Sequence, residues 1–588
     1  MEMKRTICLI LSIMIVLSVL AGCQAEPDVS TDPPESRTPT QTQEPNSQGT
    51  TASHTPGLNA EEHSETYEKI HSILKDSEFY FMDETDALVP YYEMAAERKE
   101  AMLNSPTEIV KADEFIPGET YTGTAYYVSP NGNDDNDGLS PETAWKTAGR
   151  IGWGDVQEGD AVFFERGGIY RLTEGPIRAV SNVTYSAYGE GAKPIITLAQ
   201  ENSARTDCWE LWYEGADGEK IWRYYQQTGD VCGIVLDDEA YAKRVLEWPT
   251  PEGWLALDIQ VMDPANGIIA PEDPCGKYQV ASANEYRTVE EQLVDDLTCI
   301  CRVDLTGLAY PVDFGQEYRT GDLYLRCDKG NPGECFGDIA VIAQQQNQYG
   351  DIYSNLIDGA HANGWVLDNL SMKHYGSSGI FSYLQSSQNS VIQNCTVEWG
   401  GNLLFRFESE KPTNGFCLVG DGIYCFANNV TIRNNYLRQG GNGFTFEGNW
   451  EDIDHLGSYI AEGNLIENCG QGIRTFFISP DHEGVFDGII LRNNIILDTG
   501  NGINNACWEE PVAIDLGHEP VQYAKRIEVS NNIMIGSTLA MFRIPDSTGV
   551  EIDIHDNVIA QSRDGALITE CAWLTSGGVV WHMMEDAK

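Results

Sequence analysis

An asparagine-centred repeat in the C-terminal half constrains the fold of this chain more than any other feature. Short runs of β-branched and aromatic residues alternate with Asn pairs and Gly-rich turns, as in N-N-V-T-I-R-N-N-Y-L-R at 428–438. Spacings of 25 residues, longer where insertions occur, are typical of a solenoid with one coil per repeat. The copies align on seven anchors: Asn369, Asn394, Asn435, Asn464, Asn494, Asn532 and Asn557.

Coils of this length predict an all-β fold, a parallel β-helix. Each coil would stack on the previous one about 4.8 Å away and pair with it in parallel. The apolar residues of each short strand would point inward. The Asn side chains would stack at a turn and hydrogen-bond along the ladder. We therefore interpret the Asn pairs as architecture rather than chemistry.

Residues 1–23 have the features of a targeting signal. Lys4 and Arg5 precede an apolar segment that is too short to span a membrane as a mature helix. The segment ends in Leu-Ala-Gly-Cys at Cys23, which resembles the lipobox of bacterial lipoproteins and implies lipidation of Cys23. An ordinary secretory signal is the alternative. Residues 24–59, rich in Ser, Thr and Pro, would form a disordered tether, so a lipid anchor alone would hold the protein at the outer face of the membrane.

The charge of the chain restricts its partners. It has 90 acidic and 37 basic residues, a formal net charge of -53. Such an excess repels nucleic acid and anionic lipid head groups, so we expect no nucleic-acid partner. A strongly anionic substrate would need a local basic patch or a bound cation.

The rest of the chain divides into five segments. Residues 60–104 have helical periodicity, with one helix expected from about Leu88 to Leu103, and residues 201–345 hold alternating Trp- and Tyr-rich runs. The expected segments are a helical spacer at 60–120, the start of the β-helix at 121–200, an inserted antiparallel β-rich subdomain at 201–345, the β-helix coils at 346–571 and a C-terminal tail at 572–588.

One loop resembles part of a calcium site. Asn133, Asp135, Asp137 and Gly138 match the opening of the pattern D-x-[DN]-x-[DN]-G, but Ala144 stands where the closing Glu belongs. A plain Asx-rich turn and a weak calcium site both remain open. No other metal or cofactor is expected.

A second pattern, polar-Gly-apolar, follows the Asn pairs, and strand alternation then sends every second residue outward. The first outward row is Phe381, Tyr424, Thr445, Arg474 and Asn504, and the second is Tyr383, Phe426, Glu447, Phe476 and Ala506. So many aromatic residues are unusual on a solvated sheet. Because sugar rings stack on aromatic rings while their hydroxyls need polar partners, one hypothesis is a glycan-binding groove. The other is a secondary core covered by insertions.

Long insertions follow Asn394, Phe476 and Ala506. In stacked coils, insertions at equivalent turns lie on one side and would wall a cleft. They would contribute the candidate substrate contacts Trp399, His482 and Trp508, and the further residues Glu398, Arg406, Glu408, Glu410, Asp481, Glu483, Glu509, Glu510 and His518.

From about 126 to 571 the chain resembles the pectate-lyase-like superfamily of right-handed parallel β-helix proteins. The resemblance rests on the opening segment from Tyr126, G-N-P-G-E at 330–334, E-W-G-G at 398–401 and the Asn ladders. It is strongest to bacterial β-helical glycoside hydrolases such as xylosidases, xylanases and fucosidases. The resemblance implies a glycoside hydrolase acting on plant cell-wall-type polysaccharide or oligosaccharide.

Such enzymes use paired carboxylates on adjacent coils, and Asp421 and Glu447 fall in that region. One carboxyl protonates the leaving oxygen, and the other attacks the sugar or activates water. We predict Glu447 as the acid, because desolvation among aromatic positions raises the pKa of a carboxyl. Asp421 is predicted as base or nucleophile. The alternatives are a turn role for Asp421 and an ion pair between Glu447 and Arg474. Glu398 is a reserve carboxylate, for which an ion pair with Lys373 is favoured.

Two other functions compete with hydrolysis. A polysaccharide lyase of the same fold would use Arg474, Arg406 or Lys373 as its base. A non-catalytic glycan-binding surface protein is favoured by Tyr424 and Arg474, which stand where the resemblance leads us to expect acidic residues. Tyr424, Phe426, Arg474 and Phe476 would contact the glycan in any of these cases.

Overall fold

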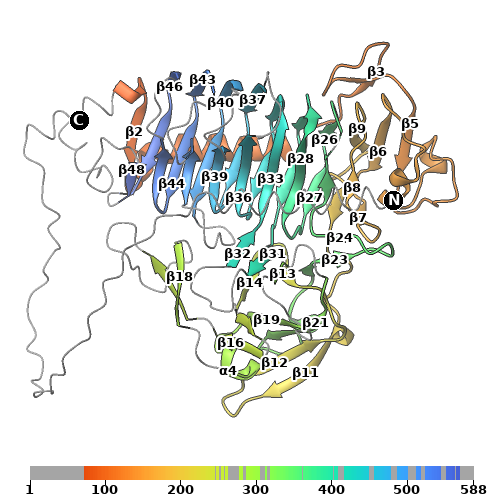
Figure 1. Ribbon diagram of the computed structural model, residues 1–588, viewed down its shortest axis with the longest axis vertical. Coiled ribbons are helices and arrows are strands. Elements are labelled where there is room, and N and C mark those ends of the chain that lie inside the picture. The colour runs from red at the N-terminus through yellow and green to blue at the C-terminus, as the bar shows by residue number, and fades with distance from the viewer. Residues whose placement is uncertain are drawn as a thin grey trace, which may run out of the picture.

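The computed structural model describes residues 72–569 apart from a set of internal segments. These segments are 246, 251–252, 257, 263–276, 283–286, 305–311, 314–317, 361, 402, 408–415, 449–455, 478–485, 501–510, 518–523, 545–550 and 563–564. Three long parallel sheets run along the molecule, and the chain visits them in turn, coil by coil (Figure 1). Crossovers between parallel strands are right-handed in nearly all proteins. The predicted right-handed parallel β-helix is confirmed.

Strands of successive coils lie side by side in each sheet, in an order that runs from the C-terminal end of the solenoid to its N-terminal end. The first sheet contains β1 (Leu74–Lys75), β46 (Glu551–His555), β43 (Arg526–Ser530), β40 (Phe486–Arg492), β37 (Leu456–Glu462), β34 (Val430–Arg433), β29 (Val391–Gln393), β26 (Val366–Asp368), β9 (Thr184–Tyr188), β6 (Ala161–Glu165) and β5 (Ala125–Val128). The second contains β2 (Glu78–Phe81), β47 (Val558–Gln561), β44 (Ile533–Ser537), β41 (Ile495–Thr499), β38 (Leu465–Glu467), β35 (Tyr436–Arg438), β30 (Thr396–Glu398), β27 (Ser371–Lys373), β10 (Ile195–Thr197) and β7 (Ile169–Arg171). The third contains β48 (Ala566–Thr569), β45 (Ala540–Arg543), β42 (Val512–Asp515), β39 (Gln471–Phe477), β36 (Asn442–Gly448), β33 (Asp421–Asn428), β28 (Ser378–Gln388), β25 (Ile357–Asp358) and β8 (Ile177–Arg178).

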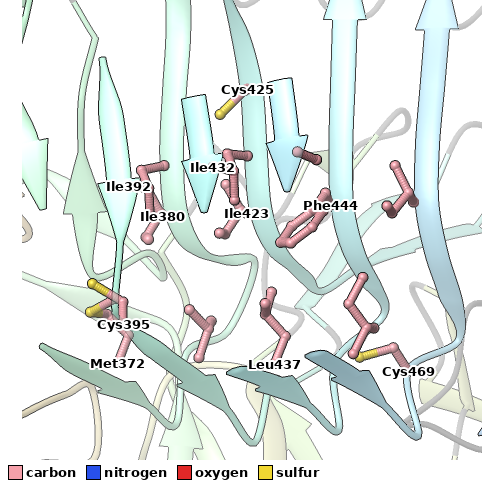
Figure 2. Close-up of a cluster of buried hydrophobic side chains, with 14 of the residues drawn as sticks. Met372, Ile380, Ile392, Cys395, Ile423, Cys425, Ile432, Leu437, Phe444 and Cys469 are labelled. Atoms are coloured by element: carbon pink, nitrogen blue, oxygen red, sulfur yellow. The ribbon is translucent and has the colours of Figure 1, made fainter. Parts of the chain in front are cut away.

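The interior of the solenoid is filled by straight stacks of apolar side chains. Figure 2 shows Ile380, Ile423 and Phe444 of the third sheet beside Ile392 and Ile432 of the first. The third-sheet stack consists of Ile380, Ile423, Phe444, Ile473, Ile514, Phe542 and Ile568. Its members pair directly from coil to coil and are fully buried. Burial of each such side chain contributes about 1.5–3 kcal/mol, so one repeated inward position supplies a continuous core.

A ladder of asparagine side chains follows one turn of the solenoid. The backbone N–H of each member donates to the side-chain oxygen of the next, across 2.9–3.1 Å. Because these side chains are fully buried, the ladder satisfies polar groups that the turn would otherwise leave unpaired. The members are Asn435, Asn464, Asn494, Asn532 and Asn557. The architectural interpretation of these residues is confirmed.

Asn369 and Asn394 do not belong to this ladder. Their φ angles of 55° and 53° match the 55° of Asn434, in the left-handed region that asparagine tolerates. Cys395 holds the ladder position of its coil, and its N–H donates to Asn435 Oδ1 across 2.9 Å. The predicted alignment is therefore wrong by one residue in its first two copies, because each has a single Asn, which Leu370 or Cys395 follows.

Two strands from the N-terminal segment extend the solenoid at its C-terminal end. Strand β1 pairs in parallel with β46, placing Leu74 beside Ile554, and β2 pairs with β47 in the same way. The Asn557 N–H donates to Ser77 Oγ across 3.2 Å, which caps the asparagine ladder. The expectation of a purely helical spacer is therefore wrong for residues 74–81, because they form most of a final coil.

Helix α3 (Thr85–Leu103) then runs back along the second sheet. It is the orange helix behind the coils in Figure 1. Its buried residues Leu88, Ala95 and Met102 pack in a cluster with second-sheet residues that include Leu465 and Ile535. The helix predicted near Leu88–Leu103 is thus present. In the part of the chain that the structure describes, no helix is long and apolar enough to cross a membrane.

The predicted inserted subdomain is also present, and Figure 1 shows it below the row of coils. Its seven-stranded sheet is antiparallel except for the pair β14–β19. Strand β13 belongs to two cores, since Cys232 and Val235 join the core of the solenoid while Val231 and Ile234 join the core of the insert. In spatial order the sheet contains β11 (Trp209–Glu214), β12 (Lys220–Tyr224), β21 (Gly321–Arg326), β19 (Thr298–Val303), β14 (Ala240–Arg244), β13 (Val231–Leu236) and β22 (Ile339–Ala343).

Smaller elements complete the described chain. The short sheets are β3 (Val110–Lys111) with β4 (Thr120–Tyr121), β15 (Glu247–Thr250) with β16 (Gly253–Ala256), β17 (Asp258–Met262) with β18 (Lys277–Ser282), β23 (Gln345–Gln346) with β24 (Ile352–Tyr353), and β20 (Val312–Asp313) with β31 (Leu403–Phe407) and β32 (Phe416–Val419). The short helices are α4 (Val289–Gln292) and α5 (Pro332–Cys335), with 3₁₀ turns at Pro141–Thr143, Ala148–Trp153 and Thr206–Cys208.

An ion-pair cluster fastens the insert to the second sheet. Asp238, in the turn between β13 and β14, accepts hydrogen bonds from Lys373 Nζ at 2.6 Å and from His374 Nε2 at 3.1 Å. Burial on its own would raise the pKa of Asp238. The bonds from His374 and Lys373 outweigh that effect and hold the pKa well below its ordinary value. Asp238 therefore remains ionised at the junction.

Candidate functional site

The outer face of the third sheet carries the first predicted row. Phe381 pairs with Tyr424, Tyr424 with Thr445, and Thr445 with Arg474. The next position is Asp515, which pairs with Arg474. The sequence pattern predicts Asn504 there, and Asn504 lies outside the described residues. The row therefore holds a carboxylate that the sequence pattern missed, because V-A-I-D at 512–515 lacks the polar-Gly marker of the other strands.

The second row is described through its backbone alone. Tyr383 pairs with Phe426, and Glu447 pairs with Phe476, in the register that the alternation predicts. The side chains of these four residues, and Ala506 as a whole, lie outside what the structure describes. Glu447 occupies the position two residues after Thr445 in β36.

Asp421 is brought to the outer face by a local break in alternation. A Cβ added to Gly422 would lie 3.0 Å from Leu437 Cδ2, so Gly422 faces the interior, as does Ile423. With two successive inward positions, Asp421 turns outward. Thr445 Oγ1 donates to Asp421 Oδ1 at 3.2 Å.

The polar residue before each glycine extends this cluster. Asn442 Nδ2 donates to Thr445 Oγ1 at 3.0 Å, so Asn442 and Asp421 meet on one hydroxyl. Asp421 is therefore the first residue of β33 and a member of a polar cluster, and its role as base or nucleophile stays a prediction. Sequence reasoning gave no role to Thr445 or Asn442, although both stood in the aligned pattern.

Asp515 and Arg543 form a buried ion pair on the same face. Arg543 Nη1 donates to Asp515 Oδ2 at 2.7 Å, and both side chains are fully buried. The Gly517 N–H donates to Asp515 Oδ1 at 2.9 Å, and Gln471 Nε2 lies 3.5 Å from Oδ2. Breaking such a pair from one side strongly destabilises a fold, so Asp515 has a structural role.

Part of the outer face remains accessible. Phe381 and Tyr424 stack with their ring centroids 5.5 Å apart and their planes 20° from parallel, and both rings are partly exposed. Arg474 is partly exposed as well, whereas Thr445 is 1% exposed and Asp421 8%. Within the described residues, this face therefore combines partly exposed aromatic side chains with nearly buried polar ones.

Trp399 does not join this face. Its side chain is 1% exposed, its φ is positive at 61°, and its ring packs edge-on against Tyr241 of the insert at 5.1 Å. The Arg438 guanidinium lies 4.8 Å from its ring. The predicted substrate contact is therefore wrong for Trp399, because the insert covers the position where its ring lies.

Glu398 is engaged in the ion pairs that its alignment favoured. Its carboxylate lies 3.3 Å from Lys373 Nζ and 3.2 Å from Arg438 Nε, in the second sheet. The remaining candidates on the insertions, His482 and Trp508 included, lie outside the described residues or have undescribed side chains. For Arg406, only the backbone pairing with Asp313 and Cys417 is described.

The calcium-like loop is closed by its own hydrogen bonds. Asn133 Oδ1 accepts from the Asp135 N–H at 3.1 Å, and Asp137 Oδ1 accepts from the Leu139 N–H and from Thr143 Oγ1. This is the geometry of an Asx-rich turn. Throughout the described residues, no group of three or more His, Cys, Asp or Glu side chains has a metal-binding arrangement.

The chain matches several solved protein structures, at low sequence identity. No protein-family model and no curated protein matches the chain. Matching solved structures include XylC with xylose, at 12% identity, TM-score 0.36, over 72% of this chain and 70% of the other. A lacto-N-biosidase of glycoside hydrolase family 136 from Eubacterium ramulus matches at 13% identity, TM-score 0.23, over 76% and 68%. A rhamnogalacturonan lyase matches at 10%, TM-score 0.32, over 73% and 75%. The fold rests on the strand pairing itself.

Proposed function

We propose that this protein is a carbohydrate-active enzyme, a glycoside hydrolase that cleaves its substrate on the outer face of the third sheet. The supporting observation is the 3.2 Å hydrogen bond between Asp421 Oδ1 and Thr445 Oγ1, two residues before Glu447 in the same strand. Through this contact the Asp421 carboxylate, at the start of β33, reaches toward the part of β36 that contains Glu447.

We propose an inverting mechanism for this pair. Inversion requires the two carboxyl groups to lie about 6.5–9.5 Å apart, which leaves room for a water molecule between the base and the sugar. In this proposal Glu447 protonates the leaving oxygen and Asp421 activates the water.

Neighbouring residues would bind the glycan. The stacked rings of Phe381 and Tyr424 offer an apolar platform for a sugar face. Arg474, in register with Thr445, would donate hydrogen bonds to hydroxyl groups. Phe426 and Phe476 extend the aromatic positions along the second row.

We further propose a plant cell-wall-type polysaccharide or oligosaccharide as substrate, with the protein held outside the cell by lipid on Cys23. The formal net charge of -53 disfavours a strongly anionic polymer. The experiment is incubation of the full chain with xylan, pectin, arabinan and fucosylated glycans, followed by product chromatography and by NMR of the first anomer released.

Glu447→Gln and Asp421→Asn should each abolish release of product, while Glu551→Gln, on the first sheet, should leave it unchanged. Unsaturated products that absorb ultraviolet light would instead indicate a lyase with Arg474 as base. Retained glycan binding without product from any polymer would indicate a binding protein. Either result would overturn hydrolysis.

A further inference from the structure

Two cysteines of the insert meet across a short loop. Cys327 directly follows β21 and Cys335 ends helix α5, with the G-N-P-G-E turn between them. Cys327 is fully buried and Cys335 is partly exposed. Gly330 links them, because its N–H donates to the Cys327 carbonyl while Cys335 Sγ lies on the side of Gly330 where a Cβ would project, and Cys335 contributes to the raised pKa of the Cys327 thiol. Both are reduced in the structure.

The loop backbone holds this arrangement in place. The Gly330 N–H donates to the Cys327 carbonyl at 3.4 Å, and the Cys335 N–H donates to the Asn331 carbonyl at 3.2 Å. A Cβ added to Gly330 would lie 3.8 Å from Cys335 Sγ, so the sulfur lies over the turn. The Asn331 side chain accepts from the Gly333 N–H at 2.9 Å, which fixes the start of α5.

We propose that Cys327 and Cys335 form a disulfide when the protein meets a small disulfide oxidant such as oxidised glutathione. The Cys335 thiolate attacks one sulfur of the oxidant, forming a mixed disulfide and releasing one glutathione thiolate. The Cys327 thiolate then attacks the Cys335 sulfur and releases the second. The two cysteines lose two electrons and two protons, which the oxidant gains as it becomes two glutathione thiols.

Burial sets the order of these steps. Burial first, and then the neighbouring Cys335, raise the pKa of the Cys327 thiol to about 12, so Cys327 is a poor first nucleophile. Cys299 and Cys301 in β19 provide an internal contrast. Burial raises the pKa of each to about 12, and both are covered by the core of the insert. They should remain thiols.

Peptide mapping tests the proposal on the full chain. The protein is oxidised with glutathione disulfide in its native state, free thiols are then blocked in denaturant, and trypsin is added without reductant. Cleavage after Arg326 and Lys329 leaves Cys327 on the peptide Cys327–Lys329, apart from Cys335. The expected product is these two peptides joined by a bond that reductant breaks. Blocked thiols on both peptides, or a link from Cys327 to another cysteine, would overturn the proposal.

Two variants test the order of reaction. Cys327→Ser should stop at the mixed disulfide and accumulate one glutathione on Cys335. Cys335→Ser should form no adduct at Cys327, because that thiol is buried. Equal adduct formation in the two variants would contradict the assignment of Cys335 as the attacking thiol. Circular dichroism of each variant confirms that it is folded.

Discussion

Arg543 Nη1 donates to Asp515 Oδ2 across 2.7 Å, and neither side chain is exposed. The two residues are register neighbours in β42 and β45, so the pair links adjacent coils of the third sheet. Replacing Asp515 with Asn would remove the carboxylate charge that Asp515 places against the buried Arg543 guanidinium. We expect the free energy of unfolding to fall by about 3–5 kcal/mol, measured by denaturant unfolding.

The matched control for Asp515→Asn is Glu528→Gln in the first sheet. The Arg526–Glu528 pair is partly exposed, with 49% and 23% of the side chains accessible. Its loss should cost less than about 1 kcal/mol. Equal effects of the two substitutions would show that burial does not distinguish the pairs.

Thr445 is predicted to position Asp421 for catalysis. Thr445→Val keeps the shape of the side chain but removes the hydrogen bond to Asp421. A hydrogen bond to a charged group is worth about 1.5–3 kcal/mol, so kcat should fall roughly 10- to 100-fold, with little change in KM. Thr445→Ser should restore most of the activity in initial-rate assays. A fall in activity that Ser does not rescue would indicate a packing role alone.

Lys193 should make stability depend on alkaline pH. Burial lowers its pKa to about 8, and its ammonium donates to Ser105 Oγ at 2.8 Å. Between about pH 8 and pH 10 the unfolded chain binds this proton more strongly than the folded chain does, so stability rises with pH. Relative to Lys193→Met, the wild type should gain up to about 3 kcal/mol across this range in denaturant unfolding. A constant difference between the two proteins would contradict the assignment.

Asp238 should make attachment of the insert sensitive to acid. Its pKa is depressed, so the stabilisation is present above the unfolded pKa of about 4 and is lost as pH falls through the folded value. Asp238→Asn should remove this dependence at a cost of about 1 kcal/mol at neutral pH, because solvent partly screens the pair. Hydrogen exchange of the backbone amides in β14 and β27, followed as a function of pH, measures how firmly the insert is attached. Unchanged exchange in both strands would show that the apolar contacts alone hold the insert.

The local sequence pattern predicted the coils of the β-helix, because neighbouring coils repeat the same pattern of residues. Asn435 and Asn464 could be recognised because each coil presents the same residue to the next. Ambiguity entered where a copy has one Asn in place of the pair, as at Asn369, which Leu370 follows, and at Asn394, which Cys395 follows. Asp515 escaped notice because its strand follows a long insertion and has no glycine before it. Its place became visible only through pairing with Arg474.

Long-range relationships were beyond the reach of periodicity. Leu74 pairs with Ile554, and nothing near Leu74 in the sequence marks that partner. The burial of Trp399 likewise depends on Tyr241, which belongs to another subdomain. Residues chosen for chemistry by type alone, such as this tryptophan, need the tertiary structure to decide between a ligand contact and a core contact.

The contribution of β1 and β2 to the last coil sets an order of events for folding. Ser77 and Asn557 are 480 residues apart, yet they share a hydrogen bond. During synthesis the segment 74–81 emerges first and must wait for partners that emerge near the end. Coils in the middle of the solenoid need only their neighbours, so they can assemble earlier, and closing the longest loop comes last. A segment made before every other strand of the solenoid is thus among the last to find its place.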